Sequence, residues 1–414
     1  MNSSKLWLCV EPSINVCIKN NQALLYDTVT KNKIIVTNTE LLSFVSKLIN
    51  HNNIIEVDND VSAIIIEFIE ELQKKFMGYL IPQSLSDKKP VQLSNILSVQ
   101  QDINKISAQE KISVTDNILK NLKEINIYLN NFENEAYLFE ANKQFLYCSE
   151  GKDKVSEVEF SSIRNFFSTI NINNLEVINL LGSDVFEYRD IEKFPELFDS
   201  KKIIFNIFCH IAVLINNLEK AKSILTNIKK RIILSVYISH SFNDVEKIDF
   251  VFKVLDELSI DYQVFFTIID ELSFENSTYI INKFNIEHYN LFPYYNGSND
   301  NFFRDNVFNT LNDILNLTPK RIDINQRKTL NSNFFGKITV SSTGEIFIYP
   351  NQIIGSINTY SLLDCLVREY NNNGLWFRIR PNIKPCQDCI YQFLCPPISN
   401  YELYFERNNL CYLD

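Results

Sequence analysis

The chain has 414 residues, enough for two or three domains that each bury a core. Its net charge of −10 argues against nucleic acid as a main partner, because phosphate binding requires a basic surface. Its 45% of hydrophobic residues is typical of a folded globular protein, yet no apolar run is long enough to span a membrane. The first residues resemble a strand and not a signal peptide, so we expect a cytoplasmic protein.

Residues 1–80 predict a small winged-helix-like α+β domain. Four β-favouring runs, "LWLCVEP", "INVCIKN", "ALLYDT" and "KIIVTN", precede two helical runs, "NTELLSFVSKLIN" and "DVSAIIIEFIEELQKKFMGYLI". Residues 81–119 are polar and contain two prolines, so we expect a linker there.

From residue 120 to 330, short apolar strands alternate with amphipathic helices. This alternation predicts a parallel sheet covered by helices, and six strands indicate a partial barrel, not a closed eight-stranded one. The predicted strands are 124–130, 176–182, 202–209, 231–239, 261–269 and 286–295.

The last section, residues 331–414, contains a predicted hairpin that turns at Thr343-Gly344, then the helical run "TYSLLDCLVREYNNNG" and a cysteine-rich tail. Common catalytic motifs, such as a P-loop, HExxH or GxSxG, are absent from the sequence, and its four histidines are dispersed. We therefore predict no catalytic residue.

Four of the nine cysteines lie in the tail, the first three spaced C-x2-C-x5-C. Thiolates suit zinc or the iron of an iron–sulfur cluster, and a C-x2-C turn brings two sulfurs to one centre. The spacing alone favours zinc, with a cluster as the alternative. The predicted ligands are Cys386, Cys389, Cys395 and Cys411. We interpret the others, Cys9, Cys17, Cys148, Cys209 and Cys365, as small buried hydrophobic residues.

Two polar residues inside the tail, Ser399 and Asn400, are candidates for hydrogen bonds to the cysteine sulfurs. The alternative is that they form the turn that begins the helical run "YELYFER".

The tail and the hairpin and helix before it resemble the SPASM region of peptide-modifying radical SAM enzymes. The matching positions are Gly344-Glu345-Ile346, Tyr349-Pro350, Gly355-Ser356-Ile357, Trp376 and the four tail cysteines. SPASM regions normally ligate two auxiliary 4Fe-4S clusters, but Tyr349 or Asn351, and Ser399, stand where the inner cluster needs cysteine. The resemblance therefore implies one 4Fe-4S cluster, held by Cys386, Cys389, Cys395 and Cys411, and makes zinc the alternative.

The same resemblance calls for C-x3-C-x2-C after the first barrel strand, to hold the cluster that binds S-adenosylmethionine. That stretch contains only Cys148, and Gly182-Ser183-Asp184 replaces the GGE-like turn after the second strand. Both contacts with S-adenosylmethionine are lost, so we do not expect this cofactor to bind.

This combination resembles the pseudo-radical-SAM proteins of Bacteroidota natural-product peptide systems, of the GG-Bacteroidales type. The matching stretches are "LLYDT", "KQFLYC", "PYYNGSNDNFFRDNVF", "FGKITV" and "PCQDCIYQFLCPPISNYE" with "NLC" beyond it. The resemblance implies an α/β fold with a degenerate radical SAM-like partial (β/α)6 barrel between the winged-helix-like domain and a SPASM-like domain. It also implies an accessory role beside a precursor peptide and an active radical SAM maturase, and leaves open whether the two proteins form an obligate heterodimer.

The N-terminal domain resembles the peptide-recognition element (RRE) of these pathways, in which a leader peptide adds as a strand beside the last strand and packs on the last helix. The matching positions are residues 33–37 and the helix 61–76. The resemblance assigns peptide binding to Lys33, Ile34, Ile35 and Val36, and to Ile65 and Ile69 on one edge of the helix. The other apolar residues of that helix are expected to form the core.

Three functions compete at this point. The first is a non-catalytic scaffold that binds a leader peptide and a radical SAM enzyme. The second is a redox protein that uses its remaining cluster for electron transfer. The third is a structural protein stapled by zinc.

Overall fold

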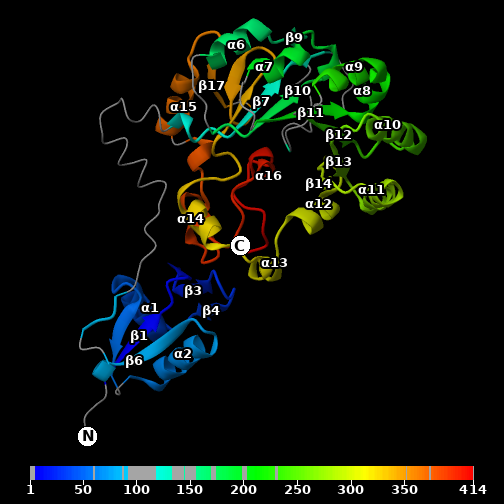
Figure 1. Ribbon diagram of the computed structural model, residues 1–414. Coiled ribbons are helices and arrows are strands. Elements are labelled where there is room, and N and C mark those ends of the chain that lie inside the picture. Colours follow the sequence, from blue (N-terminus) through cyan, green and yellow to red (C-terminus); the bar gives the residue numbers. More distant parts are fainter. Residues whose placement is uncertain are drawn as a thin grey trace.

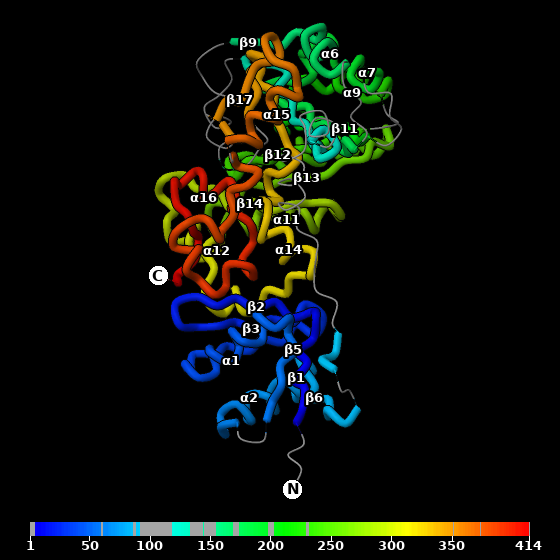
Figure 2. The backbone as a smooth tube through the Cα atoms, turned by 90° about the vertical axis from the view of Figure 1, so that its left-hand side faces the viewer, coloured from blue at the N-terminus to red at the C-terminus, as the bar shows by residue number. Residues whose placement is uncertain are grey.

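The computed structural model describes residues 5–58, 61–85, 88–91, 118–132, 144, 155–168, 174–197, 203–228, 232–350, 352–372 and 374–413. They form a small N-terminal unit and a larger α/β part built on a nine-stranded, mostly parallel sheet. The C-terminal segment lies between the two parts in both views (Figures 1 and 2). No helix among the described residues is long and apolar enough to cross a membrane.

The N-terminal unit contains two three-stranded antiparallel sheets, ordered β5-β1-β6 and β2-β3-β4. Their apolar faces and two helices enclose a core that includes Leu8, Leu25, Val45 and Leu72. The elements are β1 (Leu6–Val10), β2 (Ile14–Lys19), β3 (Gln22–Asp27), β4 (Lys33–Val36), α1 (Thr39–Asn50), β5 (Ile54–Val57), α2 (Ala63–Lys74), β6 (Gly78–Pro82) and the short η1 (Gln83–Leu85).

The four predicted strands and two predicted helices are present in this unit, but β5 and β6 were not predicted. The second helix is shorter than the apolar pattern suggests, because Phe76 adopts a left-handed φ of 57° directly after α2 ends. The chain then turns back, and β6 pairs with β1 from Gly78 to Pro82. The start of the predicted linker is therefore part of a strand, and residues 92–117 lie outside the described part.

The large sheet carries the six predicted strands side by side in chain order. Adjacent strands from β7 to β14 pair in parallel, as expected for strands joined by helical crossovers. Its order is β14-β13-β12-β11-β10-β7-β15-β16-β17. The strands are β7 (Glu124–Tyr128), β10 (Val177–Leu181), β11 (Ile204–His210), β12 (Ile232–Ile238), β13 (Tyr262–Ile268) and β14 (Tyr289–Pro293), then β15 (Lys337–Val340), β16 (Glu345–Phe347) and β17 (Ile353–Ser356).

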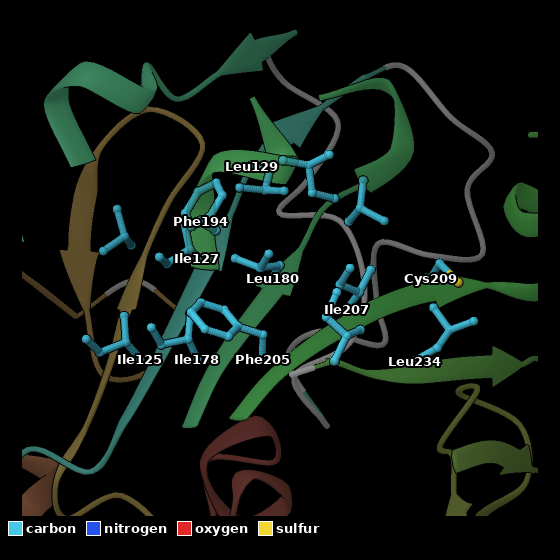
Figure 3. Packing of buried hydrophobic residues seen from close by; sticks show 14 of the residues in the cluster. Ile125, Ile127, Leu129, Ile178, Leu180, Phe194, Phe205, Ile207, Cys209 and Leu234 are labelled. Carbon is cyan, nitrogen blue, oxygen red and sulfur yellow. The ribbon is translucent and has the colours of Figure 1, made fainter. Parts of the chain in front are cut away.

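Alternate residues of these strands face opposite sides of the sheet. One face, carrying Ile125, Ile178, Phe205 and Leu234, is apolar in strands β7 to β12 and belongs to the main hydrophobic core (Figure 3). The opposite face carries asparagines and aromatic rings, among them Asn126. Helices that pack on the apolar face hold the sheet in place.

Along the chain, the helices of the larger part occur between its strands and after them, singly or in succession (Figure 1). They are α6 (Phe160–Ser168), α7 (Phe194–Leu197), α8 (Ile211–Asn216), α9 (Leu218–Ile228), α10 (Val245–Glu257), α11 (Glu271–Phe284), α12 (Asp300–Val307), α13 (Leu311–Asn316), α14 (Arg321–Thr329), α15 (Leu362–Asn371) and α16 (Asn400–Tyr404). Short strands β8 (Asn130–Asn131) and β9 (Ser156–Glu157) form a separate pair, and single turns are η3 (Val185–Glu187), η4 (Ile191–Lys193), η6 (Leu375–Phe377), η7 (Arg380–Asn382) and η8 (Cys386–Asp388).

The predicted hairpin of the C-terminal section is present as β15 and β16. Its turn requires Gly344, because the backbone there has a φ of +83°, which a residue without Cβ adopts freely. The helix predicted after it is α15, and its N-cap Ser361 and Asp364 form a capping box. Lys337 of β15 pairs in parallel with Glu124 of β7, so this section extends the large sheet.

A buried histidine makes the stability of the larger part depend on pH. Nδ1 of His210 accepts the N–H of Ala212 at 3.1 Å, and Nε2 lies 3.2 Å from Oγ of Ser239. Protonation of Nδ1 would break the hydrogen bond that this atom accepts from Ala212. Burial also disfavours the charged ring, so the pKa of His210 is lowered to about 4. The unfolded chain, with a histidine pKa near 6.5, therefore binds a proton that the folded protein excludes as the pH falls.

We expect His210→Asn to remove part of the loss of stability between pH 7 and pH 5. Asparagine can still cap α8 but does not titrate. The free energy of unfolding of the parent protein should fall by about 2 kcal/mol more than that of the variant over this range. Urea unfolding at both pH values measures the difference, and equal losses in the two proteins would contradict the role given to His210.

Candidate functional site

The four tail cysteines gather round one cavity of about 520 Å³. Cys386 begins η8, and Cys389 and Cys395 follow it in the same loop. Cys411 returns because the C-terminal segment pairs with the chain before α13: the N–H of Asn309 donates to Leu410 O at 2.9 Å. The sequence thus predicted which thiols come together, and their role as metal ligands stays a prediction.

Groups from outside the tail fix this loop. Nη1 of Arg327, on α14, donates to the carbonyls of Phe393 at 3.2 Å and Leu394 at 2.7 Å. Nδ2 of Asn331 donates to Ile398 O at 3.1 Å. These bonds end on main-chain oxygens, so they set the path of the loop without occupying the thiols.

Three of the four sulfurs accept a hydrogen bond from a nitrogen. The N–H of Tyr391 donates to Cys389 Sγ at 3.4 Å, and Nδ2 of Asn409 donates to Cys411 Sγ at 3.4 Å. Nη1 of Arg380 lies 3.5 Å from Cys386 Sγ. Donors directed at sulfur stabilise the thiolate form, which is the form that binds metals. The sequence analysis did not find these donors.

Arg380 is the charged residue on which this site depends. Its Nη2 bonds Oε1 of Glu402 at 2.7 Å, and the exposed fractions of the two side chains are 10% and 1%. Its Nε donates to Pro396 O at 2.5 Å. Burial disfavours the charged form of Arg380, but Glu402 and the neighbouring cysteine sulfurs outweigh it, so the pKa of Arg380 is raised.

Burial has the opposite effect on the thiols. It raises the pKa of Cys386 and of Cys389, and raises the pKa of Cys395 to about 12. The charge of Arg380 opposes this rise at Cys386 and Cys395. A metal that binds here must displace thiol protons, since a thiolate is the ligand.

The spacing of the four thiols bears on what they can hold. No set of three or more His, Cys, Asp or Glu side chains in the described ranges is gathered as the ligands of one ion. The cysteines instead stand round the wall of a shared cavity. Binding of either a zinc ion or a 4Fe-4S cluster would therefore have to draw the four thiols together.

The N-terminal unit forms one wall of the cysteine cavity, which the sequence analysis did not anticipate. Lys19, Asn20 and Gln22, at the turn between β2 and β3, line it. Nδ2 of Asn20 donates to Asp388 O at 3.2 Å. Beside them, Nε2 of Gln392 donates to Sγ of Cys17 at 3.2 Å, so this predicted core cysteine lies at the contact between the two parts.

Apolar packing extends the same contact. Leu24 and Tyr26 of β3 pack with Ile314, Ile390 and Leu394. The hydroxyl of Tyr26 donates to Pro319 O at 2.8 Å. The other isolated cysteines described, Cys9, Cys209 and Cys365, are buried as predicted, and Cys148 lies outside the described residues.

Ser399 and Asn400 occupy a different place from the predicted one. The N–H of Ser399 donates to Oε2 of Glu402 at 2.6 Å, so Ser399 begins α16, which was the alternative prediction. Both residues line a second cavity, between α16 and the large sheet, and not the cysteine cavity.

The residues predicted to bind a peptide divide into two groups. In β4, Ile34 and Val36 are buried, Ile35 is 43% exposed, and Lys33 O accepts Nζ of Lys75 at 2.8 Å. On α2, Ile65 and Ile69 are only 9% and 5% exposed and belong to the core of the N-terminal unit. The prediction that these two side chains face a peptide is wrong, because the apolar stripe of α2 is used to cover the sheets.

The structure describes only some of the positions that correspond to the S-adenosylmethionine contacts and to the inner cluster of a radical SAM enzyme. Asp184 follows β10, caps η3 and accepts Nδ2 of Asn217 at 2.5 Å. The stretch after β8 that would carry C-x3-C-x2-C lies mostly outside the described residues. Tyr349, at an inner-cluster position, is half-buried and packs against the main core, and Asn351 is outside the described part.

No family model and no curated protein matches this chain. Among solved structures, the chain is similar to Streptococcus suis SuiB, in the crystal structure of SuiB bound to precursor peptide SuiA. The match covers 98% of each chain at 12% sequence identity, with a TM-score of 0.45. This TM-score is too low to establish a shared fold, so the proposed function depends on the residues of this chain.

We expect Glu402→Gln to lower the free energy of unfolding by about 3 kcal/mol, because it leaves the buried charge of Arg380 uncompensated. Asp249→Asn is the matched control: it removes the exposed ion pair with Lys253 and should change stability by less than about 0.5 kcal/mol. The double variant Arg380→Gln/Glu402→Gln should be more stable than Glu402→Gln alone. Urea unfolding measures all three, and a Glu402→Gln protein as stable as the control would contradict this role.

Proposed function

We propose that this chain is a non-catalytic accessory protein in the maturation of a ribosomally synthesised peptide. It binds the leader of the precursor along β4 and partners an active radical SAM maturase in the cytoplasm. The observation that carries the proposal is that β4 is an edge strand of the same sheet whose β2–β3 turn forms a wall of the cysteine cavity. The proposed peptide-binding edge and one wall of the cysteine cavity therefore belong to the same three-stranded sheet, β2-β3-β4.

The edge of β4 has the hydrogen-bonding geometry for an added strand. The N–H of Asp27 donates to Asn32 O at 3.0 Å, and bonded pairs alternate along an antiparallel ladder. Ile34 and Val36 therefore bond toward β3, while the main-chain groups of Lys33 and Ile35 point to the other edge. An extended peptide can pair with the N–H of Lys33 and with both main-chain groups of Ile35 and continue the sheet, while Lys33 O already accepts Nζ of Lys75 at 2.8 Å.

One side of α2 lies beside this edge. Lys75, directly after α2, reaches the carbonyl of Lys33, and its ion pair with Glu71 at 2.8 Å fixes the side chain there. Ile64 is on the same side of the helix by its spacing and is half-buried. We propose that Ile64, Glu71 and Lys75, in place of Ile65 and Ile69, contact the peptide side chains.

At the four cysteines we propose one 4Fe-4S cluster, with zinc as the alternative. The support is that all four thiols line one cavity, together with the resemblance of their spacing to that of a SPASM cluster site. When bound, such a cluster supplies one-electron transfer. The charge of Arg380 and the donors Tyr391 N–H and Asn409 Nδ2 would stabilise the thiolates. The sequence offers no site for S-adenosylmethionine, so no reaction is assigned to this chain.

Leader binding is tested with fluorescently labelled leader peptides of precursors encoded beside the gene, added to the full-length protein. We expect Ile35→Pro to weaken binding at least about tenfold, because proline removes an outward N–H from the edge of β4. Ile35→Val is the control, since it keeps the main chain and the strand propensity. Equal affinities of the Ile35→Pro and Ile35→Val proteins, at equal thermal stability, would rule out strand addition at β4.

Metal and sulfide analysis of anaerobically purified protein tests the cysteine site. We expect about four iron and about four sulfide per chain, lost in Cys386→Ser/Cys389→Ser and retained in Cys209→Ala, whose thiol lies in the main core. A content of about one zinc per chain, without sulfide, would show that the cysteines hold a structural zinc ion and not a cluster. No metal in any preparation would remove both assignments.

A further inference from the structure

The three-stranded sheet β2-β3-β4 rests on the stretch of chain that joins the tail cysteines (Figure 2). Nδ2 of Asn20, at the turn between β2 and β3, donates to Asp388 O at 3.2 Å. Asp388 lies between Cys386 and Cys389 in sequence. The sheet therefore contacts the interior of the C-x2-C turn, where a displacement of either thiol also moves the acceptor of this hydrogen bond.

A second contact lies between the next two cysteines. Nε2 of Gln392 donates to Sγ of Cys17 at 3.2 Å, and this Sγ lies 4.0 Å from Cys389 O. Gln392 is buried and lies between Cys389 and Cys395 in sequence. Its Oε1 has no donor among the described residues. A buried acceptor without a donor is unfavourable, so the contact is incomplete in this arrangement of the loop.

The side chains of β3 that face the cysteine loop are separate from the core of the N-terminal unit. Leu24 belongs to the same cluster as Ile390 and Leu394, whereas Leu25, the next residue of the strand, belongs to the N-terminal core. Alternate residues of a strand point to opposite faces of the sheet. A substitution at Leu24 therefore acts on the contact with the loop and spares the N-terminal core.

The same sheet has a further support outside the cysteine loop. The hydroxyl of Tyr26 donates to Pro319 O at 2.8 Å, and Nζ of Lys31 donates to the same oxygen at 3.2 Å. Pro319 lies between α13 and α14. The sheet thus bridges two segments of the larger part, and its fit depends on where the cysteine loop lies relative to Pro319.

We propose that occupation of the four thiols by a metal strengthens the packing of the β2-β3-β4 sheet on the cysteine loop. Gathering the thiols round one centre moves Asp388 and Gln392, which lie between them, and holds the loop in one arrangement against which the sheet packs. The coupling is reciprocal, so the packed sheet also strengthens metal binding.

This coupling extends to the edge proposed for the leader, because β4 belongs to the same sheet. The inference rests on the metal site of the proposed function. It adds that the order of the N-terminal sheet depends on the occupation of that site.

The test uses Zn²⁺ as the probe, because it binds thiolates and has no redox chemistry of its own. The zinc affinity of the reduced full-length protein is measured by competition with a chelating dye. We expect Leu24→Ala to weaken this affinity about tenfold, which is within the usual range of coupling between two sites. Leu85→Ala removes the same atoms from an exposed side chain of the N-terminal unit, so it is the matched control and should leave the affinity unchanged.

A second variant leaves all apolar packing in place. Asn20→Gly removes the amide that donates to Asp388 O and keeps the left-handed backbone, whose φ is 44°. We expect it to weaken the zinc affinity about threefold. Asn21→Gly is its control, because Asn21 has the same kind of backbone, with a φ of 57°, at the next position of the turn.

Hydrogen exchange followed by mass spectrometry measures the same coupling from the side of the sheet. With zinc bound, the amides of β2, β3 and β4 should exchange at least about threefold more slowly, while those of β12 in the large sheet serve as the reference. Zinc should have a smaller effect on this exchange in Leu24→Ala, and none in Cys386→Ser/Cys389→Ser.

The outcomes separate this proposal from the metal site itself. A parent protein that binds no zinc would overturn both. Zinc binding with equal affinity in the parent, Leu24→Ala and Asn20→Gly proteins would overturn the coupling and leave the cysteine site in place. Exchange of β2, β3 and β4 that is unchanged or faster with zinc would do the same, because reciprocal coupling requires both measurements to change.

Discussion

The C-terminal part of this protein is organised round one buried positive charge. Arg380 is removed from water, and a guanidinium in that position is tolerated only when several neighbours compensate it. Glu402 supplies the opposite charge, Pro396 a carbonyl and Cys386 a sulfur. Since these partners come from α16 and from two places in the cysteine loop, satisfying Arg380 fixes all three segments relative to one another.

The sequence predicted those elements of the fold whose burial leaves a recognisable apolar pattern. Each parallel strand from β7 to β13 is buried on at least one face and appears as a short apolar run, and β14, although only partly buried, carries Leu291 and Phe292, so β7 to β14 were found in order. β5 was missed because four residues between two helices are too few to show a period. β6 was missed because its apolar residues continue the helical spacing of α2, and only the left-handed backbone at Phe76 separates the two.

The sequence likewise predicted one part of the cysteine site, the thiols, and not the groups that donate hydrogen bonds to them. Cys386, Cys389 and Cys395 are close in sequence, so their convergence follows from loop length. The donors to the sulfurs depend on how η7 and the final residues pack, which spacing does not encode. Ile65 and Ile69 were misassigned for a related reason: an apolar helix stripe has the same pattern whether it faces a core or a peptide.

A signal for the row formed by Asn126, Asn179 and Asn206 on β7, β10 and β11 was present in the sequence. "INIY", "INLL" and "FNIF" each place one asparagine inside an apolar strand, at equivalent positions of three successive strands. An isolated polar residue in such a run is unfavourable unless it is satisfied by a neighbour. Three in register bond one another, Asn206 to Asn179 and Asn179 to Asn126, which a comparison of the strands with each other would have suggested.

The contact between β3 and the cysteine loop has a consequence for the synthesis of the protein. Leu24 and Tyr26 leave the ribosome early, but the residues that cover them, Ile390 and Leu394, are made near the end. At about 5–20 residues per second, the gap of roughly 370 residues corresponds to about 20 to 70 seconds. Ile314 and Ile324, which belong to the same cluster, are made earlier, so the apolar face of β3 is covered in two stages, and the second stage waits for Ile390 and Leu394.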